Sequence, residues 1–92
     1  MIVRISTEDQ FELSDDHAER LNELDNAIVD AVAAGNEDTF KKLFDEMLSL
    51  VRDDGTVLAD DDLRDSEVIL PPPDLSFAEA GEEFQGDGLI PD

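Results

Sequence analysis

The 92-residue chain carries 26 acidic side chains against six basic ones, giving a formal net charge of −20 at pH 7. Such a charge repels phosphate backbones and bare anionic lipid, so ordinary nucleic-acid binding is excluded and any membrane contact has to be indirect. A chain of this length buries little more than about half of its unfolded surface, which argues against a roomy internal active site. Without cysteine it has no disulfide and no thiolate chemistry.

The charge balance also bears on the environment of the protein. Mutual repulsion of the acidic side chains destabilises a compact state, but at about 1 M salt the Debye length falls to about 3 Å and most of the repulsion is screened. A salt-rich, halophilic cytoplasm fits this composition, and an ordinary cytoplasm remains equally open. The opening MIVRIS lacks the pattern of a secretion signal, and no apolar run approaches the roughly 20 residues of a spanning helix. We therefore expect a cytoplasmic protein.

Residues 1–13 show a strand pattern. Val3 and Ile5 alternate with polar neighbours, as do Phe11 and Leu13, and a polar stretch separates the two pairs. This pattern predicts an antiparallel β-hairpin. An isolated hairpin is marginal in water, so its apolar side is expected to lie against a helix.

A helix is predicted to begin after Ser14, which can cap its first amides. Its acidic residues, including Asp25, are assigned to the solvent side. Gly35 can end the helix with a positive φ, and Asn36 can cap the next one. The apolar positions recur at steps of three and four residues and form one buried stripe: Ala18, Leu21, Leu24, Ile28, Ala31 and Val32.

The second helix, predicted over residues 37–52, has the strongest periodicity in the chain. The short connection to the first helix requires the two to run antiparallel, so residues 14–53 are predicted to form a helical hairpin that ends before Gly55. The apolar positions of this second helix follow the helical template throughout: Phe40, Leu43, Phe44, Met47, Leu48 and Val51.

Residues 56–92 are predicted to contain an extended segment, a short helix and a tail. A third strand is expected near Val68, before three consecutive prolines at residues 71–73. Ser76 and Glu79 have the spacing of a capping box, which predicts a helix over residues 77–84. The fold class is therefore α+β: an N-terminal hairpin packed on an antiparallel helical hairpin, with a short third strand and a short C-terminal helix, all in one domain over residues 1–92.

Few residues suggest chemistry. His17 could act as a general base for Ser14 or Ser66, but no nucleophile elbow accompanies it. The acidic run Asp60, Asp61, Asp62 and Asp65 lacks the alternating ligands and central glycine of a calcium loop. Gly86 and Gly88 precede no helix that could present amides to a phosphate. We predict no catalytic residue, no metal and no cofactor.

Two short apolar motifs are better candidates for contact with another protein. The first is Val68, Ile69 and Leu70, and the second is Leu89, Ile90 and Pro91 near the C-terminus. The second motif can either tuck against its own domain or insert into a partner, and the sequence leaves both open. We predict these six residues as the partner-binding site.

The order of the motifs resembles the PspAA family of PspA-associated proteins of the phage shock system. The resemblance covers nearly the whole chain: the MIVRI opening, LNELDNAIVDAV and LFDEMLSLVRDDG in the helices, then DSEVILPPPD and GDGLIPD. It implies a non-enzymatic accessory protein of the envelope stress response, with no catalytic motif to transfer. The implied partner is PspA, a coiled-coil membrane-remodelling protein.

We therefore expect an adaptor that binds a PspA-like coiled coil and reaches the inner face of the membrane through it. An alternative from another class is an acidic mimic of nucleic acid that occupies a DNA- or RNA-binding protein. A hydrolase using His17 is a third reading. The sequence leaves open whether the chain self-associates.

Overall fold

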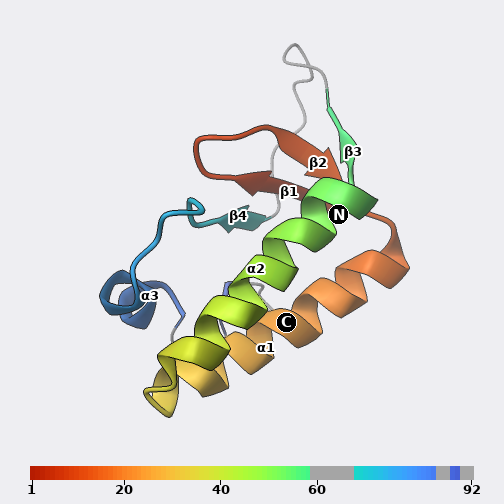
Figure 1. Ribbon diagram of the computed structural model, residues 1–92. Coiled ribbons are helices and arrows are strands. Elements are labelled where there is room, and N and C mark those ends of the chain that lie inside the picture. The colour runs from red at the N-terminus through yellow and green to blue at the C-terminus, as the bar shows by residue number, and fades with distance from the viewer. Residues whose placement is uncertain (59–67, 85–87, 90–92) are drawn as a thin grey trace.

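The computed structural model describes residues 1–58, 68–84 and 88–89. Its elements are β1 (Ile2–Ile5), β2 (Gln10–Glu12), α1 (Asp15–Ala33), α2 (Glu37–Asp54), β3 (Thr56–Val57), β4 (Val68–Leu70) and α3 (Phe77–Glu83). The predicted α+β class is confirmed, because a β-hairpin, a helical hairpin, a later short strand and a C-terminal short helix follow one another along the chain (Figure 1).

The strands form one sheet in the order β3-β2-β1-β4. β1 and β2 are antiparallel, with Val3 opposite Phe11, and β4 runs parallel to β1, with Val68 beside Val3. The sequence did not predict β3, which pairs with β2 through Val57 and Phe11. A strand of two residues is too short to show a periodicity of two, so its pairing follows from where α2 ends rather than from its own pattern.

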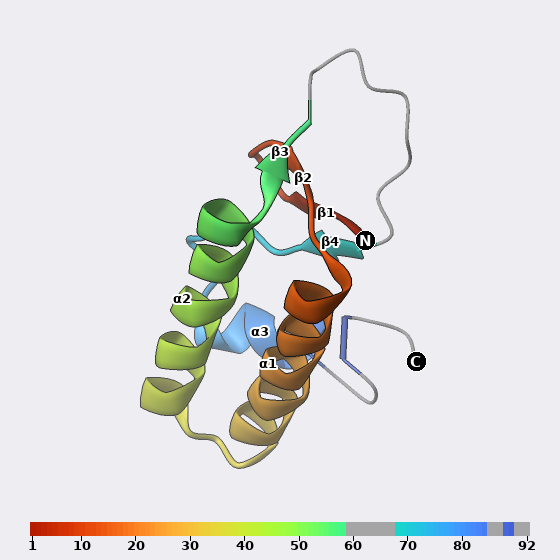
Figure 2. The ribbon, with the colours of Figure 1, turned by 90° about the vertical axis from the view of Figure 1, so that its right-hand side faces the viewer.

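The two faces of the sheet differ in burial. Val3, Ile5 and Phe11 are buried on the inner face, whereas Arg4 is exposed on the other. The three helices lie on one side of the sheet (Figure 2). Successive side chains of a strand point to opposite faces, so the helices cover Val3, Ile5 and Phe11 and leave Arg4 outside.

The hairpin is held at both ends by contacts outside its strands. At the open end, Leu13 N–H donates to Met1 O at 2.8 Å, and the Met1 amino group donates to Leu13 O at 3.0 Å. At the turn, where Thr7 has a φ of 70°, Arg52 Nε donates to Glu8 Oε1 at 3.0 Å and a second guanidinium nitrogen pairs with Glu8 Oε2. The hydrogen bond to Glu8 raises the pKa of Arg52. The turn is therefore tied to the end of α2 by a two-pronged ion pair.

The connection between α1 and α2 makes the helices antiparallel. Gly35, with a φ of 71°, donates its N–H to Val32 O at 3.1 Å, and Asn36 N–H donates to Ala31 O at 2.9 Å. These two bonds are the Schellman pattern, in which a residue with left-handed backbone ends the helix. The Asn36 side chain then accepts from Thr39 N–H at 3.2 Å and caps α2. The predicted helical hairpin is confirmed, with α2 two residues longer than expected.

The core lies between the helices and the inner face of the sheet. Four of the five phenylalanines gather at the end of the helical hairpin that is remote from the sheet. The Phe40 ring lies 5.5 Å from Phe44, 5.6 Å from Phe77 and 6.1 Å from Phe84, measured between centroids. Because Phe77 and Phe84 bracket α3, this cluster attaches the last helix to the helical hairpin.

Replacing Phe40 tests this attachment. We expect Phe40→Ala to lower the free energy of unfolding by about 3–5 kcal/mol, since it removes a buried ring and leaves a cavity among three others. The measurement is chemical denaturation in high salt. Val57→Ala, at a side chain that is 55% exposed, is the control and should change stability by less than about 0.5 kcal/mol. A loss below about 1 kcal/mol for Phe40→Ala would contradict the packing described.

Candidate functional site

The three residues of the first predicted contact motif form β4, and their side chains point to two different faces of the sheet. Val68 and Leu70 are buried and pack beside Val3 and Ile5 of β1, whereas Ile69 is 59% exposed. This follows from the strand periodicity, because the middle residue of three points away from its neighbours. Of the three residues, Ile69 alone exposes its side chain to solvent, and Val68 and Leu70 support it from the core.

Ile69 also lies at an edge of the sheet. β4 is the last strand in the order, and Ser6 N–H donates to Leu70 O at 2.9 Å. In a parallel ladder, alternate residues of a strand bond to the neighbouring strand, so the main-chain groups of Ile69 point away from β1. The prolines at residues 71–73 follow at once and keep this edge short, which limits uncontrolled strand pairing. Arg4, next to Ile69 in the register, adds an exposed positive charge.

The second predicted motif is described at Leu89, while Ile90 and Pro91 lie outside the described residues. The Leu89 side chain is partly buried against the core, as the tucked alternative expects. Its N–H donates to both carboxyl oxygens of Asp25 in α1, at 3.0 Å each. Two segments far apart in the sequence are thus joined at one buried acid.

Asp25 is the residue that sequence reasoning placed wrongly. The sequence pattern predicts Asp25 on the solvent side with the other acids of α1, yet its side chain is fully buried. The signal was present in its spacing, because Asp25 follows Leu21 by four residues and precedes Ile28 by three, on the apolar stripe. A buried carboxyl group is tolerated where hydrogen bonds satisfy it, and the main-chain N–H of Leu89 provides one.

His17 lies in the first turn of α1 between a serine and an aspartate. Its Nδ1 is 3.1 Å from Ser14 Oγ, and its Nε2 is 3.8 Å from Asp54 Oδ2. The order is that of a catalytic triad, but the contact to Asp54 is longer than a hydrogen bond, and His17 and Asp54 are 40% and 47% exposed. Ser14 Oγ already accepts from His17 N–H as the helix cap. This geometry is that of a capped helix end. The other serine considered, Ser66, lies outside the described residues.

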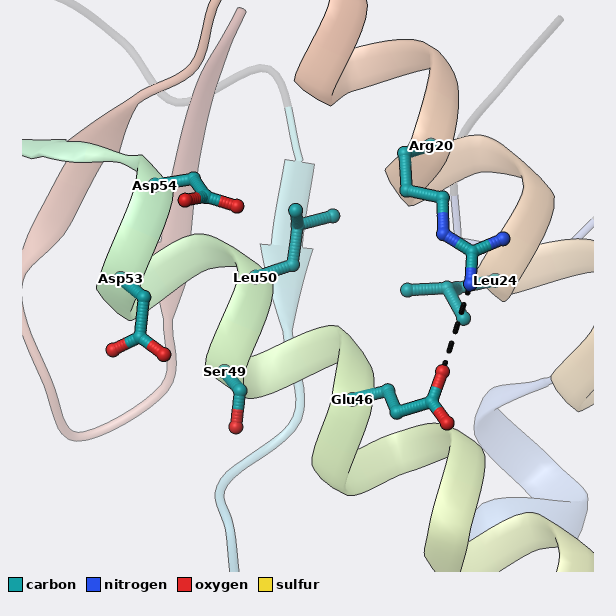
Figure 3. Close-up of a pocket in the computed structure, with 7 residues that line it drawn as sticks. All are labelled: Arg20, Leu24, Glu46, Ser49, Leu50, Asp53 and Asp54. Atoms are coloured by element: carbon teal, nitrogen blue, oxygen red, sulfur yellow. Dashed lines mark ion pairs between the residues drawn. The ribbon is translucent and has the colours of Figure 1, made fainter.

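A shallow groove of about 330 Å³ runs between α1 and α2 (Figure 3). Arg20 crosses it toward Glu46, with 3.6 Å between the charged atoms, and also pairs with Glu23 on its own helix. The lining is otherwise mainly acidic around two leucines: Leu24, Glu46, Ser49, Leu50, Asp53 and Asp54. An open acidic groove of this kind suits a cationic side chain of a partner better than an enclosed substrate.

No group of metal-ligating side chains occurs within residues 1–58, 68–84 and 88–89. The acidic run Asp60, Asp61, Asp62 and Asp65 lies outside this range. In the part of the chain that the structure describes, no helix is both long enough and apolar enough to span a bilayer.

Removing the carboxyl group of Asp25 tests the contact with Leu89. We expect Asp25→Ala to lower the free energy of unfolding by about 1–3 kcal/mol, because the N–H of Leu89 loses its acceptor. Denaturant unfolding measures the loss. The matched control is Asp30→Ala, which removes the same charge from an exposed position of α1 and should change stability by less than about 0.5 kcal/mol. Equal losses in the two variants would show that the buried contact contributes nothing.

Comparison with known proteins agrees with the motif order. The family model described as PspA-Associated protein, PspAA, matches residues 1–92. No curated protein and no solved structure matches the chain. The family model extends over every element described above, from β1 to the Gly88–Leu89 segment on Asp25. The chain therefore belongs to the PspAA family, whose description names association with PspA.

Proposed function

We propose that this protein is a non-catalytic adaptor that binds a PspA-like coiled-coil protein and reaches the inner face of the membrane through it. The observation that carries the proposal is the family match over residues 1–92, since the family is described by its association with PspA. Binding to a coiled coil, a role in the stress response and a cytoplasmic location are parts of the same proposal.

The surface of the protein supports contact through the edge of the sheet. Ile69 is a large apolar side chain exposed on one face of β4, and its main-chain groups point away from β1, toward the outer edge of the described sheet. A partner that covers Ile69 would bury apolar surface without disturbing the core, because Val68 and Leu70 stay in place beneath it. A few fully buried residues carry most of the binding energy at interfaces, and Ile69 would be one of them in this arrangement.

The acidic helices support a second part of the recognition. Glu46, Asp53 and Asp54 line the groove between α1 and α2, where Arg20 contributes one opposing charge. Such a surface attracts basic stretches of a partner and chiefly accelerates encounter. The same surface supports the acidic-mimic alternative, in which electrostatics supplies the affinity itself.

The absence of catalysis is proposed from the geometry at His17. Its side chain and that of Asp54 are partly solvent-exposed, at 40% and 47%, and the nearby serine caps a helix. His17→Ala should therefore leave partner binding unchanged. Loss of a measurable hydrolytic activity in that variant would favour the enzyme reading.

A charge introduced at Ile69 tests the docking edge. We expect Ile69→Asp to weaken binding of the purified PspA protein from the same organism by about tenfold or more, since a charge would have to be desolvated in the interface. The matched control is Val57→Asp, which adds the same charge at the opposite edge of the sheet, on a side chain exposed to a similar degree, 55% against 59%. Calorimetry or a surface-binding assay measures both.

Salt separates the adaptor from the mimic. Apolar docking should persist when the salt concentration is raised from about 0.15 to about 1 M, which shortens the Debye length from about 8 to about 3 Å. A mimic of nucleic acid should lose its affinity steeply over the same range.

Equal affinities of Ile69→Asp and Val57→Asp for the PspA protein, at any salt concentration, would reject the β4 edge as the contact.

A further inference from the structure

The segment Gly88–Leu89 is seated on α1 by a side chain that the proposed docking edge does not use. Asp25 is fully buried, and both of its carboxyl oxygens accept from the Leu89 N–H at 3.0 Å. We name Asp25, Gly88 and Leu89 together the Asp25 latch. Its two sides come from residues 63 and 64 positions apart, so the contact can break without breaking α1.

Glycine at position 88 is required by the closed latch in two ways. Its φ of 84° lies in the left-handed region, which side chains disfavour. A Cβ at this position would also lie 2.8 Å from Asp25 Cγ and closer still to Oδ2. The backbone at position 88 therefore lies so close to the Asp25 carboxyl group that no side chain larger than that of glycine fits.

Closing the latch hides the apolar group that the sequence predicted for a partner. Leu89 packs against the core when its N–H is bound to Asp25. In that state the Leu89 side chain is partly buried within its own molecule. Among the described contacts, the segment is held by the Leu89 N–H bond to Asp25 and by the partly buried Leu89 side chain. A partner that offers Leu89 a better apolar site can compete for both.

We propose that the Asp25 latch is an autoinhibitory contact. The closed latch holds Leu89 against its own molecule, and release of the latch makes Leu89 available to bind the partner. The inference rests on the proposed function, because the partner is the PspA-like coiled coil. When only a fraction of the molecules is in the binding-competent state, the apparent affinity for the partner is reduced by that fraction. A variant that opens the latch should therefore bind more tightly.

Gly88→Ala is expected to open the latch without a substitution in α1, because the added Cβ would meet the carboxyl group of Asp25. We expect it to bind the purified PspA protein from the same organism about three- to tenfold more tightly than the wild type. Gly35→Ala is the matched control, because Gly35 also has a positive φ, of 71°, but a Cβ there meets nothing within 4 Å. It should bind like the wild type. In the double variant Gly88→Ala, Leu89→Ala, the gain should disappear.

Amide exchange in the free protein provides a readout that needs no partner. The Leu89 N–H should exchange faster in Gly88→Ala than in Gly35→Ala. Equal Leu89 exchange in the two variants would overturn the latch and leave the proposed function standing. If the gain in affinity persists in the Gly88→Ala, Leu89→Ala double variant, the autoinhibition is overturned. It is also overturned if the Leu89 N–H exchanges faster in Gly88→Ala but the affinity for the PspA protein does not rise. If no variant binds the PspA protein, the proposed function fails, and autoinhibition of that binding fails with it.

Discussion

The apolar contact between α1 and α2 is the interaction on which the rest of the structure depends. Its direction is set at Gly35, where the Schellman bonds turn the chain back on itself. The paired helices present Phe40 and Phe44 to α3 at one end, and at the other the Arg52–Glu8 ion pair holds the hairpin turn. Sheet and last helix are thus both placed by one helical hairpin.

This arrangement separates the large negative charge from the core. Nearly all acids of the helices lie on exposed faces, where solvent and salt screen them. Asp25 is the exception within the described residues, and it is buried where a main-chain N–H can satisfy it. A buried acid without hydrogen bonds would lower the stability of the protein. The bond from the Leu89 N–H therefore both satisfies Asp25 and couples the Gly88–Leu89 segment to α1.

The surface and the latch suggest how a small protein can regulate its own binding. Ile69 stands at an edge that is open in the described structure, while Leu89 is held by Asp25. One apolar group is therefore exposed in this structure, and the exposure of the other depends on an internal contact. A partner that engages both would recognise the protein first and complete the interface afterwards, which makes the second step a point of control.

Local sequence patterns were enough to predict both long helices, the N-terminal hairpin, the strand at Val68 and the short helix after Ser76, because each has a periodicity or a cap that acts over a few residues. Tertiary structure alone decided the pairing of β3, since two residues carry no period. It also placed Val68 and Leu70 inside and Ile69 outside, because the register with β1 selects the face. The same holds for Asp25: its contact joins residues 64 positions apart, and only the folded chain brings its carboxyl group to Leu89.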